Sequence, residues 1–427
     1  MKHSITAIIL CIISAASLRA EVTLEWCVEK AMANYPIVKK YGLLSATKEI
    51  ELSDINKSWL PRADVYAQAT LQNAVPSFPA YLSDIVAGMG HEIGGLDKLQ
   101  YKVGADISQT VWDGGASKAR REIARSKEAL QTATLDVELY GVRQRVESIY
   151  FAILLTEEQI AQSRVTYNLL NNNLEKLRAM LRNGTAMQAD VDMTEAQALA
   201  INQIITQATN ASEGYRRTLE LFTGEKIGNE KLVRPEAEMP LTAESNRPEL
   251  TLFERRLDAN QASQRLADRA MMPKVGFFLQ TYYGYPGFDY FKSMTDKKLS
   301  FNLLGGVKVS WNIDSFYTRK NTRRKTALNA NDIAADRELF LFNTRIATAG
   351  QNAAIKGLRE VMKDDERIVA LRGNVRRAAE SQLANGVIDT TALLTKISDE
   401  NMAQLTAIYH RIQLIQEIYK LKYTLDR

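Results

Sequence analysis

Few residues in this chain have the type and spacing that catalysis or phosphate binding requires. The turn Asp113-Gly114-Gly115 could suggest a phosphate-binding loop, but it lies between a predicted strand and a predicted helix. An aspartate at such a corner is more often an N-cap, whose carboxylate accepts hydrogen bonds from the free amides of the first turn. Residues 88–95 are rich in glycine but lack the Lys-Ser/Thr pair of a phosphate-binding loop. Neither segment predicts catalysis.

Histidine and cysteine are too scarce for a zinc site or a histidine-based catalytic triad. Beyond the first twenty residues the chain has only His91, His410 and Cys27, and the two histidines lie in unrelated contexts. A single cysteine cannot form an internal disulfide, so we expect Cys27 to be a small buried residue and not a reactive thiol. The sequence therefore predicts no enzyme activity, no cofactor and no metal site.

The first twenty residues predict an export signal. A positively charged start is followed by an apolar run over residues 5–16, which is too short to span a bilayer as a helix. We therefore interpret residues 1–20 as a signal peptide, with small residues at Ser14 to Ser17 or Ala20 as alternative cleavage points. No later stretch reaches about 18 consecutive apolar residues, so no transmembrane helix is expected.

The charge balance bears on one class of partner, nucleic acid. The chain has 55 basic and 50 acidic residues, and two of the basic residues, Lys2 and Arg19, fall in the predicted signal peptide. The remaining near balance gives no support to a nucleic-acid partner.

The elements that position these residues occur twice along the chain. Asn34-Tyr35-Pro36 recurs as Asn246-Arg247-Pro248, Pro61 as Pro273, Trp112 as Trp311, and Asn183-Gly184 as Asn385-Gly386. The separations are about 212, 212, 199 and 202 residues, which indicates a tandem duplication with one shortened loop. We predict a first repeat at residues 21–224, a linker at 225–247 and a second repeat at 248–427.

Each repeat is predicted to contain a long helical hairpin, at residues 116–223 and 317–425. In the first hairpin an apolar seam alternates spacings of three and four residues, the heptad pattern of helices that pack knobs-into-holes. This seam includes Val142, Val146, Ile153 and Leu170. The second hairpin has the same pattern near the end of its long helix, at Ile368, Leu371, Val375 and Ala378. We expect these seams to face the returning helix, with each Asn-Gly pair forming the turn.

Four segments predict strands with one apolar and one polar face. They lie at about residues 62–73, 100–112, 274–285 and 298–312, and charged residues occur only on the polar face. Such strands are typical of a transmembrane β-barrel, apolar toward lipid and polar toward a wet lumen, although a soluble sheet with one buried face is the alternative. An open sheet edge is forbidden in lipid because its backbone groups lack partners. A barrel in lipid would therefore need several copies of the chain. Three copies would give twelve strands, but the strand count alone does not exclude two or four copies.

The ordered set of motifs resembles the TolC-like outer-membrane efflux factors. The resemblance covers the mature chain and lies in the following features: the export signal, Thr23-Leu24-Glu25 with Ala31 and Asn34-Tyr35-Pro36, the corner Trp112-Asp113-Gly114-Gly115, the two Asn-Gly turns and the duplication. It implies a mostly α, α+β membrane protein. Each protomer would give four strands to a trimeric 12-stranded outer-membrane barrel, and coiled-coil helices to a periplasmic α-helical tunnel.

The resemblance also implies a function and partners. The chain would be the outer-membrane channel subunit of a tripartite efflux or type I secretion system, working as a homotrimer with a periplasmic adaptor protein and an inner-membrane pump. It would be a passive exit duct for drugs, metals or polypeptides. The alternative is a non-channel structural or adhesive coiled-coil protein of the envelope, which would explain the heptads but not the four two-faced strands.

There are two sets of predicted site residues, and the first follows from the resemblance. At the periplasmic tips, near Asn183-Gly184 and Asn385-Gly386, the family pattern places an aspartate where this chain has Asp190. The matching positions of the second repeat, Ala392 and Thr395, are not acidic. Leu383 and Ile388 replace the tyrosine and arginine of the best-known member, so we expect an apolar constriction formed by Leu383, Ile388 and Met187.

Trp112 and Trp311 form the second set. Each ends a predicted descending strand, where a tryptophan can anchor the barrel at the membrane–water interface. Packing against the helix below is the alternative.

Overall fold

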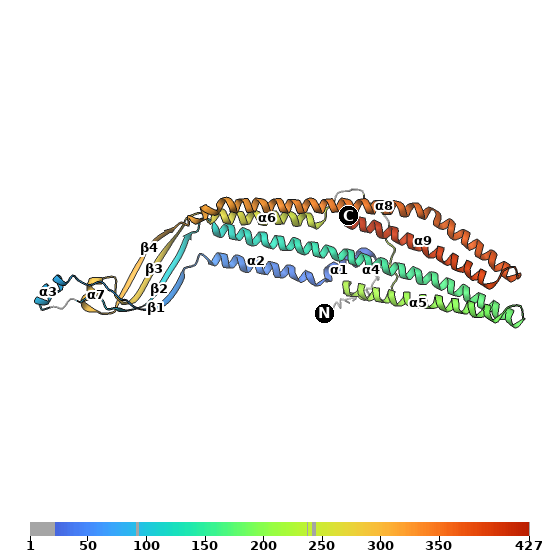
Figure 1. Ribbon diagram of the computed structural model, residues 1–427, viewed down its shortest axis with the longest axis horizontal. Coiled ribbons are helices and arrows are strands. Elements are labelled where there is room, and N and C mark those ends of the chain that lie inside the picture. The colour runs from blue at the N-terminus through green and yellow to red at the C-terminus, as the bar shows by residue number, and fades with distance from the viewer. Residues whose placement is uncertain (1–21, 91–93, 237, 241–244, 427) are drawn as a thin grey trace, which may run out of the picture. The chain divides into compact units, whose positions relative to one another are not determined.

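The computed structural model describes residues 22–90, 94–236, 238–240 and 245–426. The predicted signal peptide and His91 lie outside these residues. Along the chain the elements are α1 (Leu24–Asn34), the 3-10 helix η1 (Pro36–Val38), α2 (Lys39–Lys57), β1 (Arg62–Leu71), α3 (Ala80–Gly88), β2 (Leu99–Trp112), α4 (Ala116–Arg182), α5 (Gln188–Thr223), α6 (Pro248–Arg269), β3 (Lys274–Tyr285), α7 (Tyr290–Asp296), β4 (Ser300–Ser310), α8 (Asp314–Ala384) and α9 (Thr390–Leu425) (Figure 1).

These elements form two compact units, each drawn from both halves of the chain. The helical unit comprises Met1–Tyr41, Thr134–Thr251 and Glu338–Arg427. The sheet unit comprises Gly42–Ala133 and Leu252–Arg337. The long helices α4 and α8 contribute residues to both units. No described helix is long and apolar enough to cross a membrane.

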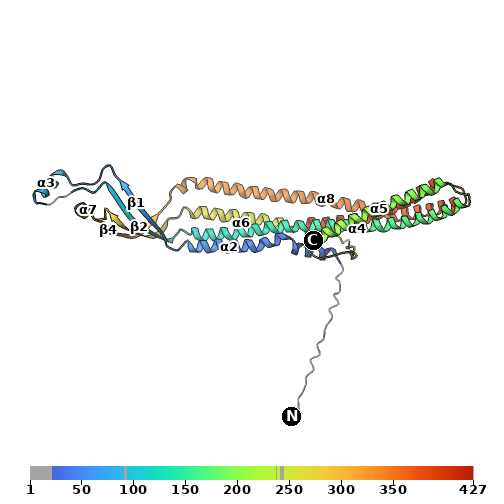
Figure 2. The same cartoon turned by 90° about the horizontal axis from the view of Figure 1, so that it is seen from below.

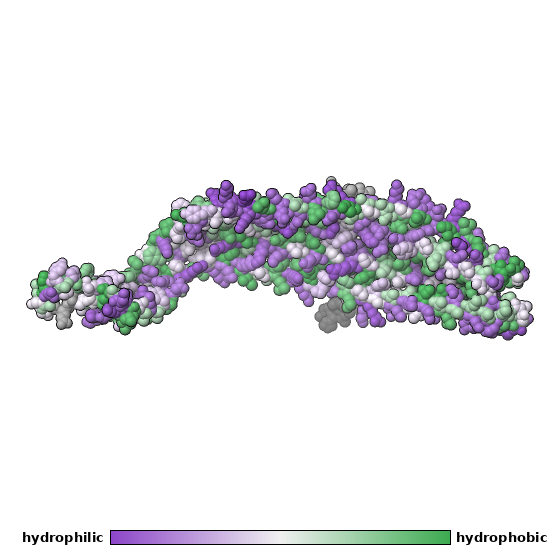
Figure 3. All heavy atoms as spheres, viewed as in Figure 1, coloured by the Kyte–Doolittle hydropathy of each residue, from purple (hydrophilic) through white to green (hydrophobic). Residues whose placement is uncertain are grey.

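The sheet unit contains one antiparallel sheet with the strand order β1-β2-β3-β4. The register puts the predicted apolar positions of neighbouring strands side by side: Val65 lies opposite Ala105, and Phe277 lies opposite Val307. This face is exposed, with Val65 80% and Phe301 69% accessible. Figure 3 shows apolar side chains reaching the surface of this unit. The two-faced alternation is confirmed, and within this chain the apolar face is left uncovered.

The corner between β2 and α4 depends on two glycines and one aspartate. Gly114 and Gly115 have φ values of +71° and +86°, which favour glycine. The carboxylate of Asp113 accepts hydrogen bonds from the Gly115 amide at 2.9 Å and the Ser117 amide at 2.5 Å. Partial burial raises the pKa of Asp113, but these hydrogen bonds outweigh it and hold that pKa below its usual value. The predicted N-cap is confirmed.

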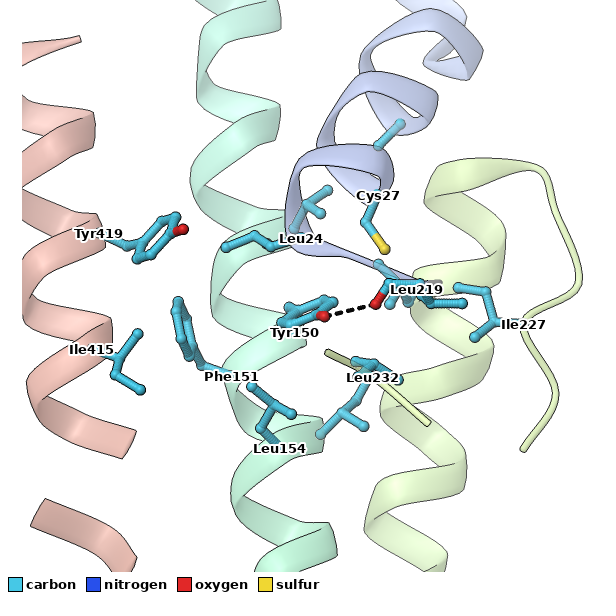
Figure 4. Packing of buried hydrophobic residues seen from close by; sticks show 14 of the residues in the cluster. Leu24, Cys27, Tyr150, Phe151, Leu154, Leu219, Ile227, Leu232, Ile415 and Tyr419 are labelled. Atoms are coloured by element: carbon cyan, nitrogen blue, oxygen red, sulfur yellow. Dashed lines mark hydrogen bonds between the residues drawn. The ribbon is translucent and has the colours of Figure 1, made fainter. Parts of the chain in front are cut away.

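The largest core of the helical unit lies where α1 packs between α4 and α5. Figure 4 shows Cys27, Tyr150 and Leu219 meeting there from these three helices. The Tyr150 hydroxyl donates to the carbonyl oxygens of Val22 at 2.8 Å and Val233 at 2.6 Å, which satisfies a fully buried polar group. Burial raises the pKa of the Cys27 thiol to about 12. The prediction that Cys27 is buried is confirmed.

The two predicted seams have different outcomes. On α4 the seam residues Val142, Val146, Ile153 and Leu170 are fully buried, as predicted. On α8, Ile368, Leu371 and Val375 are exposed, so the expectation that they face the returning helix is wrong. The buried α8 side chains in this region are Ile355 and Ala379, which pack with residues of α9. Periodicity identified an apolar face of α8, but α9 packs on a neighbouring face.

Candidate functional site

The ends of the two helical hairpins, both in the helical unit, are the first candidate site. Figures 1 and 2 show α5 returning beside α4, and Figure 1 shows α9 returning beside α8. Gly184 and Gly386 have φ values of +73° and +69°. The Gly184 amide donates to the Leu181 carbonyl oxygen, and the Gly386 amide donates to the Leu383 carbonyl oxygen, each at 3.0 Å. Each bond satisfies a carbonyl that the end of the helix would otherwise leave free. The two predicted Asn-Gly turns are confirmed.

Each turn is followed by a carboxylate that caps the returning helix. The Asp190 carboxylate accepts from the Met187 amide at 2.9 Å, and the Asp389 carboxylate accepts from the Ala392 amide at 2.8 Å. In a full capping box the N-cap side chain accepts from the N3 amide, and the N3 side chain accepts from the N-cap amide. Asp190 makes the second of these bonds in the first hairpin, and Asp389 makes the first of them in the second hairpin. Asp389 was not predicted from the sequence, although an aspartate one residue before a helix is a recognised N-cap signal.

The predicted constriction residues do not come together as a group in this chain. Leu383 and Ile388 are partly buried and pack on a cluster drawn from α4, α5, α8 and α9, whereas Met187 is 72% exposed. The buried members of that cluster are Leu170, Ala198, Ile201, Ala379, Leu393 and Ile397. Within one protomer, Leu383 and Ile388 therefore help to hold the two hairpins against each other.

A polar network connects α8 to α9 next to this cluster. Arg372 pairs with Asp399 at 2.8 Å, and Arg376 pairs with both Glu400 and Glu380. Partial burial lowers the pKa of Arg376, but its hydrogen bonds to the two glutamates outweigh this effect and raise it overall. This network was not predicted, because heptad spacing does not show which charges of α8 lie against α9.

A second connection joins α4 to α9. The Thr166 hydroxyl donates to the Asn401 side chain at 2.7 Å, and Gln162 donates to Gln404. These two contacts link the first hairpin to the second, whereas the Arg372 and Arg376 pairs lie within the second hairpin.

The two predicted anchor tryptophans are both partly exposed, in the sheet unit. Trp112 is 46% and Trp311 is 57% accessible. The Trp311 indole N–H donates to the Met271 carbonyl at 2.9 Å, and its ring packs edge-on against Phe316 at 6.1 Å. One edge of Trp311 thus packs on the link between α6 and β3 and on the start of α8, and the rest of the ring is exposed. Membrane anchoring by these residues stays a prediction.

No group of three or more His, Cys, Asp or Glu side chains within the described ranges is placed to hold a metal ion. His410 instead pairs with Asp365 of α8, with 2.9 Å between its Nδ1 atom and the carboxylate. The site residues described above are thus engaged in helix capping, packing and ion pairing.

The fold is that of solved outer-membrane channels. VceC, an outer membrane protein of Vibrio cholerae, is 12% identical with a TM-score of 0.68, and the match covers 94% of this chain and 95% of that chain. The CmeC outer membrane channel of Campylobacter jejuni is 14% identical with a TM-score of 0.65, covering 94% of this chain and 85% of that chain. The outer-membrane channel OprN is 15% identical with a TM-score of 0.66, covering 94% and 89%.

No family model and no curated protein matches this sequence. At these low identities the structural matches establish the fold. The resemblance predicted from the sequence is confirmed at that level.

Proposed function

We propose that this chain is the outer-membrane channel subunit of a tripartite efflux or type I secretion system, and that it acts as a passive exit duct. The observation that carries the proposal is the sheet: its apolar face is exposed, and its outer strands β1 and β4 each have one edge that is unpaired among the described residues. A contiguous exposed apolar face marks a surface that is covered by lipid or by another protein. The shared fold with solved outer-membrane channels supports the lipid as that cover.

The unpaired edges favour a closed ring of several copies. An edge strand in lipid would leave a row of amide and carbonyl groups without partners, and pairing β1 of one copy with β4 of the next removes both edges. Three copies would supply twelve strands to one barrel in the outer membrane, with the helices forming a tunnel in the periplasm. We further propose that the chain arose by duplication, with repeats at residues 21–224 and 248–427 and a linker at 225–247.

The proposed partners are a periplasmic adaptor protein and an inner-membrane pump, which would meet the hairpin ends. The cargo would be drugs, metals or polypeptides that leave through the lumen. The tip residues support a gating role because their contacts are non-covalent and lie at exposed helix turns. Crosslinking from cysteines introduced at Gly184 and Gly386 would test this proposal, and recovery of no periplasmic partner would contradict it.

Two measurements test the channel itself. The protein should fractionate with outer membranes as an oligomer that migrates differently before and after heating, and the purified oligomer should conduct ions across planar bilayers. A stable single-chain protein in the soluble periplasmic fraction would contradict the channel proposal.

The apolar constriction at the tips is a separate proposal with its own test. Replacing Leu383 and Ile388 by serine should raise tunnel conductance if these side chains narrow the tip, because a wet surface replaces an apolar one. Met187→Ser is the matched control for an exposed apolar tip residue outside the cluster. Unchanged conductance in the Leu383 and Ile388 variants would contradict the constriction.

The alternative function is a structural or adhesive coiled-coil protein of the envelope. One observation favours it: the exposed stripe of Ile368, Leu371 and Val375 on α8 would suit a partner helix of another protein. The same stripe can be covered by another copy in a channel. Absence of conductance from a membrane-inserted oligomer would favour this alternative.

A further inference from the structure

A cationic pocket lies at the base of the sheet, in the sheet unit. Arg62 is the first residue of β1, Lys274 is the first residue of β3, and Arg120 lies near the start of α4. These three side chains line one pocket of about 230 Å³. All three residues are exposed, and elements that are far apart in the sequence thus place three positive charges around one concavity.

These three cations have no carboxylate partner among the described residues. Some cations of the same unit are paired, Lys127 with Glu51 at 2.6 Å for example, and others such as Arg324 are unpaired among the described residues. What sets the three pocket cations apart is that they line one concavity. Uncompensated positive charges in one concavity favour the binding of an anion. Arg62 and Arg120 are suited to oxygen anions because a guanidinium can donate two parallel hydrogen bonds to one phosphate.

The one carboxylate in the pocket is already engaged. Asp113 also lines it, but its two oxygens accept from the Gly115 and Ser117 amides at the N-terminus of α4. The positive end of the helix dipole compensates much of this negative charge. Asp113 therefore weakens the field of the three cations without neutralising it.

One wall of the pocket is apolar. Trp59 and Leu60, in the link between α2 and β1, line it together with the cations, and Leu60 is 61% exposed. The carbonyl of Trp59 accepts a hydrogen bond from the Gln109 side chain at 3.3 Å, which fixes this link against β2. An engineered cavity of about 150 Å³ holds benzene, so a pocket of this size has room for a phosphate and part of an alkyl chain.

The side of the sheet that carries the pocket is the polar one. Arg62 lies opposite Ser108 in the register, and both belong to the face predicted to be polar. Lys308 lies on the same face, opposite Gly276, but does not line the pocket. Exposure of the pocket to the channel interior rests on the proposed function, whereas its capacity to bind an anion does not.

We propose that this pocket binds a phosphate group attached to an apolar chain, with the phosphate on Arg62, Arg120 and Lys274 and the chain on Trp59 and Leu60. A phosphate monoester carries up to two negative charges and three acceptor oxygens, which matches three converging cations better than a carboxylate does. The group can come from a soluble alkyl phosphate or from a phospholipid headgroup, a phosphate diester with one negative charge; only the first can reach the pocket if it opens into the channel interior.

The test is a titration of octyl phosphate into the oligomer held in phosphatidylcholine nanodiscs. Wild-type protein should bind saturably, and Arg62→Gln/Arg120→Gln should bind about tenfold more weakly or worse, since two charge-assisted contacts are lost. The matched control is Lys308→Gln/Arg324→Gln, which removes the same charge from exposed residues outside the pocket. Arg62→Lys/Arg120→Lys keeps the charges but loses the paired guanidinium donors, so it should bind more weakly than wild type and more tightly than the Gln variant.

Three results would overturn the proposal: equal binding by the Gln variant and wild type, an equal loss in the control variant, or equal binding of the neutral octyl glucoside. Nanodiscs that contain phosphatidylglycerol separate the two sources. Weakened octyl phosphate binding there assigns the pocket to a lipid headgroup, and unchanged binding assigns it to a soluble anion. Binding by a protein that conducts no ions would keep the pocket and reject only the channel function.

Discussion

The helices α4 and α8 carry similar apolar stripes, but within the helical unit only α4 buries its stripe in its own chain. Val146 and Leu170 of α4 are inaccessible, whereas Leu371 of α8 is 54% exposed. The difference lies in what covers each helix. α1 and α9 pack on α4 around Val146, and α5, α8 and α9 pack around Leu170, whereas α9 packs on Ala379, on a face of α8 next to that of Leu371. A heptad pattern therefore predicts an amphipathic face of a helix but not which element packs on that face.

The largest expected effect is a core truncation on α4. Phe151 is 2% exposed and packs edge-on against Tyr419 at 5.6 Å, so Phe151→Ala should lower the free energy of unfolding by about 3–5 kcal/mol. Leu371→Ala on α8 should change it by less than about 0.5 kcal/mol in the isolated protomer. Urea unfolding followed by circular dichroism measures both. Equal losses would mean that α8 is covered as α4 is.

The second prediction concerns Glu147, a buried charged residue of α4. Burial raises the pKa of Glu147 to about 7, although Arg143 lowers it; Glu25 and Lys422 act on it more weakly, in opposite directions. A carboxyl group whose pKa is raised by folding stabilises the fold below its unfolded pKa of about 4.5 and loses that contribution as pH rises through about 7. Unfolding free energy should therefore fall by about 3 kcal/mol between pH 4.5 and pH 8 through this group alone.

The Glu147→Gln variant tests this assignment. It keeps the volume and removes the titration, so the pH dependence of unfolding between pH 5 and pH 8 should flatten. Glu380→Gln on α8, which replaces a more exposed carboxylate, should keep the wild-type slope. An unaltered slope in Glu147→Gln would contradict the role of this group.

The third prediction compares the two Asn-x-Pro motifs of the helical unit. Tyr35 of the first motif stacks on Phe222 with ring centroids 6.2 Å apart. Arg247 of the second motif pairs with Glu249, and its guanidinium lies within 5.1–5.8 Å of the rings of Tyr140, Phe340 and Tyr423. Arg247→Ala should cost about 2–3 kcal/mol, because it removes these contacts and leaves Glu249 unpaired. Tyr35→Leu should cost about 1 kcal/mol, the value of a stacked pair.

Thermal and urea unfolding of the two variants measure this difference. Arg247→Lys serves as the matched control, since it keeps the charge but loses the planar guanidinium. Full stability in Arg247→Lys would mean that charge alone stabilises the second motif. Equal losses in Arg247→Ala and Tyr35→Leu would remove the distinction between the halves.

The smallest expected effect is at the hairpin ends. Asp389→Ala removes a side-chain N-cap from α9 and should lower stability by about 1 kcal/mol. Asp190→Ala removes the reciprocal bond of α5 and should have a similar or smaller effect. Hydrogen exchange of the first turns of α5 and α9 would measure the fraying. A large change in channel conductance without fraying would instead assign these carboxylates to the gate.

Much of the local structure could be read from particular residues. Asp113 caps a helix, the Asn-Gly pairs form tight turns, and Cys27 is buried, because each depends on nearby backbone chemistry or on residue type. The candidate site was less predictable. Asp389, and the pairs that Arg372 and Arg376 make with α9, depend on how two helices align along their lengths. A hydrophobic period of 3.5 residues does not determine how the two helices align along their lengths.

By itself the sequence determined the helices, the turns, and the two faces of the four strands, because propensity, capping and alternation are properties of neighbouring residues. Tertiary structure alone decided which stripe is buried and which stays exposed, since burial depends on the elements that pack from distant parts of the chain. It also decided that Arg62, Arg120 and Lys274 meet in one pocket. Residues separated by up to 212 positions share that corner because the sheet register places the starts of β1 and β3 at the same end.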